Sequence, residues 1–176
     1  GIVNFDIQAF ETVANDECAN RTTIAVTTGG VSSYSVDLRA ATESIDGSCD
    51  GNVANNYLDA WYEFTMPVNG NVRVTGIDGS DGIAFYDVCG GTELACYYND
   101  GFIYNLSAST TYVLRVTNRA LFAGLVNFDI QAFETAVNDE CANASTVNVG
   151  IVDYTEVSYD LRAATESMDA SCDNSA

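Results

Sequence analysis

The sequence contains neither lysine nor histidine, so its positive charge comes from six arginines set against 25 aspartate and glutamate residues. The net charge of −19 excludes a nucleic-acid partner, because neutralising phosphates requires a basic surface. It also disfavours an anionic membrane surface, which would repel the chain. A charge of this size favours solubility and cation binding, and it does not indicate a fold.

The absence of histidine excludes nucleophilic triads in their usual form, and zinc sites built from histidine or CxxC pairs are absent too. No pair of carboxylates is marked out for glycoside hydrolysis, and no Gly-rich phosphate loop is present. We therefore predict that the chain is not an enzyme. No apolar run approaches the roughly 20 residues of a membrane span, so we expect no membrane insertion.

Six widely spaced cysteines without histidine indicate disulfides and an oxidising compartment. The chain does not begin with methionine and shows no signal-peptide pattern, so we expect a mature or excised segment of a secreted, cell-surface protein. Three Asn-x-Ser/Thr triplets fit this setting and are candidates for covalent glycans. Their asparagines are Asn20, Asn105 and Asn143.

The decapeptide VNFDIQAFET occurs twice, at residues 3–12 and 126–135. When the sequence is shifted by 123 residues, residues 1–53 align without a gap on residues 124–176, and 32 of the 53 positions are identical. A period of 123 residues is too long for a solenoid unit and has the size of a whole domain. The sequence therefore predicts a tandem array of domains.

The pattern within one period is all-β, because short alternating segments are separated by turns rich in glycine and asparagine. The expected strands are 23–27, 34–38, 60–66, 71–77, 82–88, 93–98, 102–106 and 111–117. Residues 39–45 are expected to form a single helical turn.

The repeated decapeptide alternates apolar and polar residues, so we expect it to form the closing strand of each domain. Residues 1–14 would then close a preceding repeat, residues 15–137 would form one complete domain, and residues 138–176 would open the next. The apolar positions of these assembly strands are Val3, Phe5 and Ile7 in the first copy and Val126, Phe128 and Ile130 in the second.

Residues 1–14 and 138–176 are each too short to bury a core, so something outside them must complete each domain. Either the polypeptide continues, or neighbouring subunits supply the missing strands, as in donor-strand complementation. Both alternatives make the protein its own partner, arranged head to tail.

Several segments carry a family resemblance: NDECAN at 15–20, WYEFTMPVNGNVRV at 61–74, DGIAFYDVCGGTELAC at 81–96 and TTYVLRV at 110–116. Together they resemble the secreted β-sandwich repeats of Bacteroidota surface proteins, which are similar in pattern to the bacterial pre-peptidase C-terminal domain. The resemblance spans residues 15–137 and implies an antiparallel, jelly-roll-like β-sandwich without catalytic residues. Such units occur in adhesins, matrix proteins and filaments, or as modules of secreted enzymes.

The repeat predicts the disulfides Cys18–Cys49 and Cys141–Cys172, because each copy must be self-sufficient. Cys89 and Cys96 flank a Gly-Gly turn and are predicted to clamp that hairpin.

Acidic residues in turns are candidate Ca²⁺ ligands, because carboxylates near backbone carbonyls are the ligand set of this ion. The candidates are Asp16, Asp78, Asp81 and Asp100. No segment has the EF-hand spacing, and aspartates that cap turns in water are the common alternative. The sequence requires no other cofactor.

Trp61, with tyrosines nearby, is a candidate platform for stacking on a sugar, but a lone tryptophan in a sandwich strand more often fills the core. We favour the core for Trp61, and also for Phe64, Phe85 and Phe102.

Two functions follow from these observations. The first is a structural subunit of an extracellular bacterial filament or surface stalk, built from disulfide-bonded, glycosylated β-sandwich repeats. The alternative is a carbohydrate- or surface-binding module of an adhesin or a secreted enzyme. A contact that recurs between successive units would favour the first, and a concave aromatic cluster would favour the second.

Overall fold

A computed structural model of the chain describes residues 1–50, 57–78, 81–119, 124–139, 141–148, 156–158, 161–162 and 164. The strands are β1 (Thr22–Thr23), β2 (Ser32–Asp37), β3 (Tyr57–Thr65), β4 (Gly70–Thr75), β5 (Asp81–Tyr86), β6 (Glu93–Tyr97), β7 (Gly101–Leu106), β8 (Thr111–Arg119) and β9 (Leu125–Glu134). Short 3-10 turns lie at η1 (Cys18–Asn20), η2 (Leu38–Ala40) and η4 (Cys141–Asn143).

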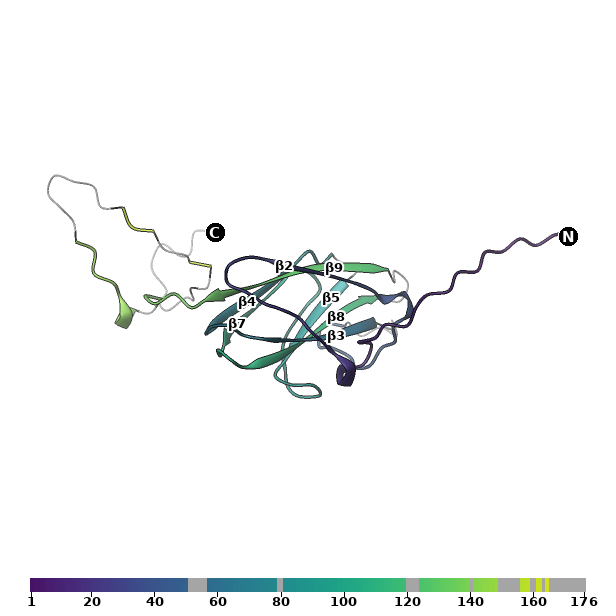
Figure 1. Cartoon of the computed structure of the whole chain (residues 1–176), viewed down its shortest axis with the longest axis horizontal. Helices are drawn as coiled ribbons and strands as arrows, with labels where there is room; N and C mark the ends of the chain where they lie inside the picture. Colours follow the sequence, from purple (N-terminus) through teal and green to yellow (C-terminus); the bar gives the residue numbers. More distant parts are fainter. Residues whose placement is uncertain are drawn as a thin grey trace.

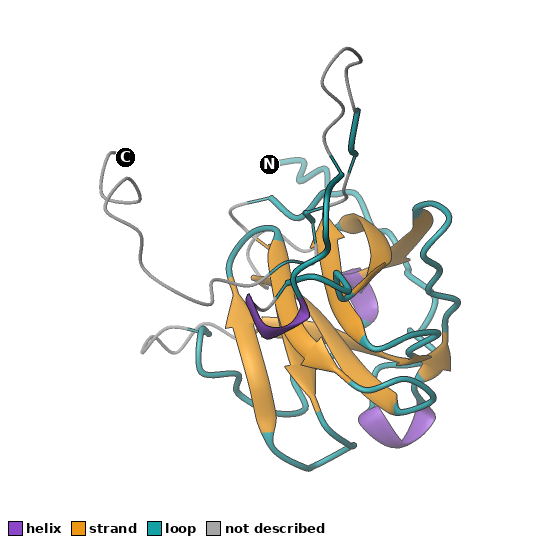
Figure 2. Ribbon diagram, turned by 90° about the vertical axis from the view of Figure 1, so that its left-hand side faces the viewer, coloured by secondary structure: helices purple, strands orange, loops and turns teal. Residues whose placement is uncertain are grey.

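The strands form two sheets that pack face to face (Figures 1 and 2). One sheet has the order β1-β3-β8-β5-β6 and the other has the order β2-β9-β4-β7. All pairs are antiparallel except β1 with β3. This order is that of a jelly roll with one added edge strand. The predicted all-β sandwich is therefore confirmed, and no helix among the described residues is long and apolar enough to cross a membrane.

The observed strands agree with the expected ones to within a few residues, because alternation of apolar residues is a local signal. The main differences are that β1 is only two residues long and that the helical turn is η2, which overlaps the expected 39–45 only at residues 39–40.

Aromatic and branched side chains from both sheets fill the space between them. The inward-facing residues of β3, for example, are Ala60, Tyr62 and Phe64, which alternate with outward-facing ones. The Tyr62 ring meets the ring of Phe128 on β9 edge-on, with 5.2 Å between centroids. The two sheets are thus joined by direct aromatic contact.

The closing strand β9 lies in the interior of its sheet, between β2 and β4. Val126, Phe128 and Ile130 all point into the core and are fully buried. The identical decapeptide at residues 3–12 forms no strand, and Figure 1 shows it leaving the sandwich at the end opposite the C-terminal segment. Its Val3, Phe5 and Ile7 are largely exposed.

Little of the opening part of the second repeat lies among the described residues. The η4 turn repeats η1 at the equivalent position, whereas most of residues 149–176 lie outside the described residues. The division into residues 1–14, 15–137 and 138–176 therefore stays a prediction.

Two phenylalanines at equivalent positions of the decapeptide give a matched test of this fold. Phe128 is 1% exposed and Phe5 is 76% exposed. We expect Phe128→Ala to lower the free energy of unfolding by about 3–5 kcal/mol, because it leaves a cavity between the sheets. Phe5→Ala should change it by no more than about 0.5 kcal/mol. Urea unfolding measures both, and equal effects would show that β9 is not part of the core.

Candidate functional site

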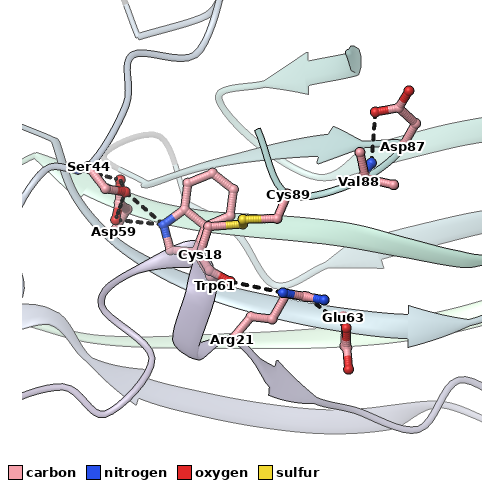
Figure 3. Close-up of a disulfide and its surroundings, with 9 residues drawn as sticks. All are labelled: Cys18, Arg21, Ser44, Asp59, Trp61, Glu63, Asp87, Val88 and Cys89. Atoms are coloured by element: carbon pink, nitrogen blue, oxygen red, sulfur yellow. Dashed lines mark hydrogen bonds and ion pairs between the residues drawn. A yellow bond between two sulfur atoms is a disulfide. The ribbon is translucent and has the colours of Figure 1, made fainter. Parts of the chain in front are cut away.

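Two segments that precede β3, residues 15–20 and 42–50, lie on the outer face of the five-stranded sheet, and we call them the covering segments. They contact β3 around Trp61. Its side chain is fully buried. The indole Nε1 donates to Ser44 Oγ at 2.8 Å and to Asp59 Oδ1 at 3.0 Å (Figure 3). Trp61 therefore belongs to the core, as predicted, and offers no face to a sugar.

A buried ion cluster lies beside the indole. Arg115 Nε donates to Asp59 Oδ2 at 2.9 Å, and Arg115 Nη1 donates to Asp50. Burial raises the pKa of Asp59, although Arg115 acts in the opposite direction. Burial would lower the pKa of Arg115, but its two carboxylate partners raise it overall. The ion cluster connects the covering segment at residues 42–50 to β3 and β8. We assign a structural role to this cluster.

The motifs that occur in both repeats lie in or overlap the covering segments, where they contact β3 and each other. Asn15 donates to the backbone oxygen of Trp61 at 2.8 Å and accepts, through its own backbone oxygen, from the Trp61 N–H at 2.8 Å. Asp16 accepts from the backbone N–H of Thr42 at 2.6 Å and from its hydroxyl at 2.8 Å. The blocks NDECAN and DLRAATES are therefore explained by packing.

The predicted disulfide pairing is wrong for the first repeat. The structure pairs Cys18 with Cys89 (Figure 3) and Cys49 with Cys96. Cys89 lies in the β5–β6 turn, whereas Cys96 lies within β6 opposite Ala84, so the two cannot clamp one hairpin. Each disulfide instead joins a covering segment to the five-stranded sheet. The predicted Cys141–Cys172 pair lies outside the described side chains.

These disulfides close longer loops than the predicted ones. Their sequence separations are 71 and 47 residues. On the chain-entropy account each is worth about 4 kcal/mol, since the constraint on the unfolded chain grows with loop length.

An aromatic groove lies at one edge of the sandwich. Strands β6 and β7 are the edge strands of the two sheets, and they approach each other there. The hollow between them has a volume of about 390 Å³, which is at the lower end for small-molecule sites. Its lining consists of Leu94, Ala95, Tyr97, Phe102, Ile103, Tyr104, Asn105, Leu106 and Tyr112.

The groove presents one exposed ring next to a polar amide. Tyr104 is 53% exposed, and its ring lies 4.7 Å from that of Phe102. Asn105 follows with φ of +61°, a left-handed conformation in which its backbone N–H donates to Asn71 Oδ1 at 3.0 Å. Within the groove, the hydroxyl of Tyr97 donates to the backbone oxygen of Phe102 at 2.7 Å. These contacts fix the wall of the hollow, and we call this hollow the aromatic groove.

The sequence did not indicate this site. Phe102 was expected in the core, but it is only half-buried and lines the groove. Phe64 and Phe85 are buried, as expected. The Phe102–Tyr104 alternation is visible in the sequence, but only the sheet order shows that it lies on an edge strand.

The candidate Ca²⁺ ligands are divided between two places. Asp16 is engaged with Thr42 on the covering segment, as described above. At one end of the sandwich, Asp100 accepts from the backbone N–H of Ile77 at 3.2 Å. Asp78 precedes β5, and Asp81 is the first residue of β5. Burial, and then the charge of Asp78, raise the pKa of Asp81 to about 6.

The three sequon asparagines, Asn20, Asn105 and Asn143, are all exposed. Exposure is required for modification but does not show that it occurs, so covalent glycans stay a prediction.

The chain belongs to the T9SS-associated family described as galactose binding domain-like. The family model matches residues 14–130 and again residues 137–176, two segments whose starts have the spacing of the sequence repeat. This membership defines a secreted Bacteroidota β-sandwich domain, located outside the cell or in its envelope. Similarity to the pre-peptidase C-terminal domain stays a prediction.

No curated protein matches the chain. Among solved structures, PliG of Salmonella Typhimurium, a periplasmic inhibitor of g-type lysozyme, is similar at 16% sequence identity. The alignment covers 64% of this chain and 99% of PliG with a TM-score of 0.35, so nothing about function follows from it.

Tryptic mapping without reduction tests the disulfides, because arginine is the only basic residue. The structure predicts that peptide 1–21 is linked to peptide 74–115, which is in turn linked to peptide 40–73. Further cleavage after Glu93 should leave Cys89 with the first peptide and Cys96 with the third. A product containing only peptides 1–21 and 40–73 would contradict this pairing.

Proposed function

We propose that this domain is a carbohydrate-binding module of a secreted Bacteroidota protein and that the aromatic groove holds the sugar. The observation that carries the proposal is the exposed Tyr104 ring in a groove that Asn105 also lines. An aromatic face attracts the polarised C–H groups of a pyranose ring, and an amide can both donate to and accept from its hydroxyls. The family description supports a galactose-type ligand.

The groove suits binding without chemistry. Its lining contains no carboxylate, arginine or cysteine, and its polar atoms come from tyrosine and asparagine. General acid–base chemistry on a glycosidic bond requires positioned carboxyl groups. The proposal therefore assigns recognition to the groove and no catalysis.

Binding to galactose-terminated glycans tests the proposal. We expect Tyr104→Ala to weaken binding about two- to tenfold, because one stacking contact is worth about 0.5–1.5 kcal/mol. Tyr98→Ala is the matched control, since Tyr98 is 43% exposed but does not line the groove. Binding is detected with a glycan array, and the affinities are then measured by calorimetry. The protein used is one in which mass spectrometry finds no modification of Asn105. Absence of any galactoside binding, or equal losses in both variants, would contradict the proposal.

We further propose that binding modules of this kind follow one another along one polypeptide. Support comes from a contact that recurs with the sequence period. The guanidinium of Arg39 lies over the ring of Phe10, 4.2 Å from its centroid, and Arg162 lies over Phe133 at 4.8 Å. In each case the second phenylalanine of a decapeptide copy contacts the arginine of the DLRAATES block that follows it. A cation–π contact of this kind is worth about 0.5–1 kcal/mol when exposed, so it orients a short connector without locking it.

A hollow at the second of these joints contains residues from both repeats. Its lining consists of Thr28 and residues 132–137 from the first repeat and of Asn138, Ser158 and Arg162 from the second. A recurring joint favours a regular array, and this arrangement does not require a filament. The filament function is the weaker candidate, because the family match supports a binding module.

Chymotrypsin tests this domain order, because the two decapeptides offer identical cleavage sequences. In the 176-residue chain we expect rapid cleavage after Phe5 and Phe10 and slow cleavage after Phe128 and Phe133, which lie in β9. In a longer polypeptide that carries the preceding repeat, all four sites should be resistant. Continued rapid cleavage after Phe5 there would show that residues 3–12 do not close a preceding domain.

A further inference from the structure

A buried polar pair lies at one end of the sandwich, where β5 begins and β8 ends. Asp81 and Asn118 are register partners on these strands. They are 7% and 5% exposed, and Asn118 Nδ2 donates to Asp81 Oδ1. Because Ile83 and Phe85 follow Asp81 at alternate positions and face the core, the Asp81 side chain also points inward at this end.

The amide of Asn118 is only half satisfied. Its Oδ1 is buried and has no hydrogen-bond partner in the part of the chain that the structure describes. A buried carbonyl oxygen without a partner carries the full cost of its lost hydration, so such atoms are rare in folded proteins. The free oxygen is on the same carbon as the nitrogen that contacts Asp81. It therefore lies close to the Asp81 carboxylate.

The Asp81 carboxylate has no positive partner among the described residues. None of the ion pairs described for the chain includes Asp81, and buried Arg115 is engaged by Asp50 and Asp59 on the outer face of the sheet. Asp78 adds a second carboxylate close by, and its backbone oxygen accepts from the Asp81 N–H at 2.9 Å. Burying carboxylate charge without a counter-charge is costly.

One ligand would satisfy both the Asp81 carboxylate and Asn118 Oδ1. We propose that Asp81 and Asn118 Oδ1 bind a Ca²⁺ ion, with Asp78 contributing charge beside them. Ca²⁺ takes oxygen ligands only, combines carboxylates with amide carbonyls, and tolerates irregular geometry with water in the remaining positions. A bound ion would turn the unpartnered oxygen into a ligand and tie the end of β5 to the end of β8.

Thermal unfolding at pH 7.5, after removal of metal with EDTA, tests the site. We expect the midpoint to rise with CaCl₂ and to keep rising with the logarithm of its concentration above Kd, because the ion binds only the folded state. At equal ionic strength MgCl₂ should raise it less, since Mg²⁺ demands strict octahedral geometry. Asp81→Asn should weaken Ca²⁺ binding, measured by calorimetry, by at least the roughly 10–100-fold that loss of an outer-shell partner costs.

Two further variants keep the test decisive. Asp6→Asn removes the same charge from the exposed N-terminal segment and should leave the Ca²⁺ response unchanged. Asn118→Asp should lower the midpoint in EDTA, because it adds a carboxylate, and Ca²⁺ should restore it. Equal responses to Ca²⁺ and Mg²⁺, or equal responses in wild type and Asp81→Asn, would indicate general screening of the −19 charge and overturn the proposal. No response at all would overturn it too and would favour a protonated Asp81 that donates to Asn118 Oδ1.

Discussion

The insertion of β9 between β2 and β4 is the constraint on which the rest of this structure depends. Without β9, strand β2 has no partner in its sheet, and the β4–β7 pair loses its neighbour on one side. Phe128 on β9 also supplies an aromatic contact to the opposite sheet. Since β9 comes last in the domain, the four-stranded sheet cannot be completed until the whole domain is present, and such non-local pairing makes folding slow. The aromatic groove depends on this order, because β7 forms one of its walls.

A second layer of contacts holds the outer face of the five-stranded sheet. The Arg115 cluster and both disulfides connect this sheet to segments that precede β3 in the sequence. A buried ion pair is weak evidence for stability, because desolvation offsets most of the attraction. Its clearer effect is to specify where the covering segment lies, since misplacing that segment would leave buried Arg115 without one of its two carboxylate partners. The disulfides stabilise the same arrangement by restricting the unfolded chain.

Much of the fold could be predicted from the sequence, and much of the site could not. Alternation and turn residues are local, so the strands and the burial of Trp61 followed from short stretches of sequence. The partner of Cys18 depends on which strand its segment crosses, and the repeat alone suggested Cys49 where the structure has Cys89. The exposure of Tyr104 depends on β7 being an edge strand, a property of the sheet order. Asn118 was overlooked as a ligand because its relation to Asp81 arises from the pairing of β5 with β8.

The function proposed for this domain requires its ligand to bind at the edge between β6 and β7. Mapping amide chemical-shift changes by NMR during titration with a galactoside tests it most directly, because the map locates the ligand independently of any variant. The account predicts that the largest changes fall on residues 94–97 and 102–106, with little change in the Trp61 and Arg115 cluster. Changes centred on another part of the sandwich, with the β6–β7 edge unaffected, would contradict it.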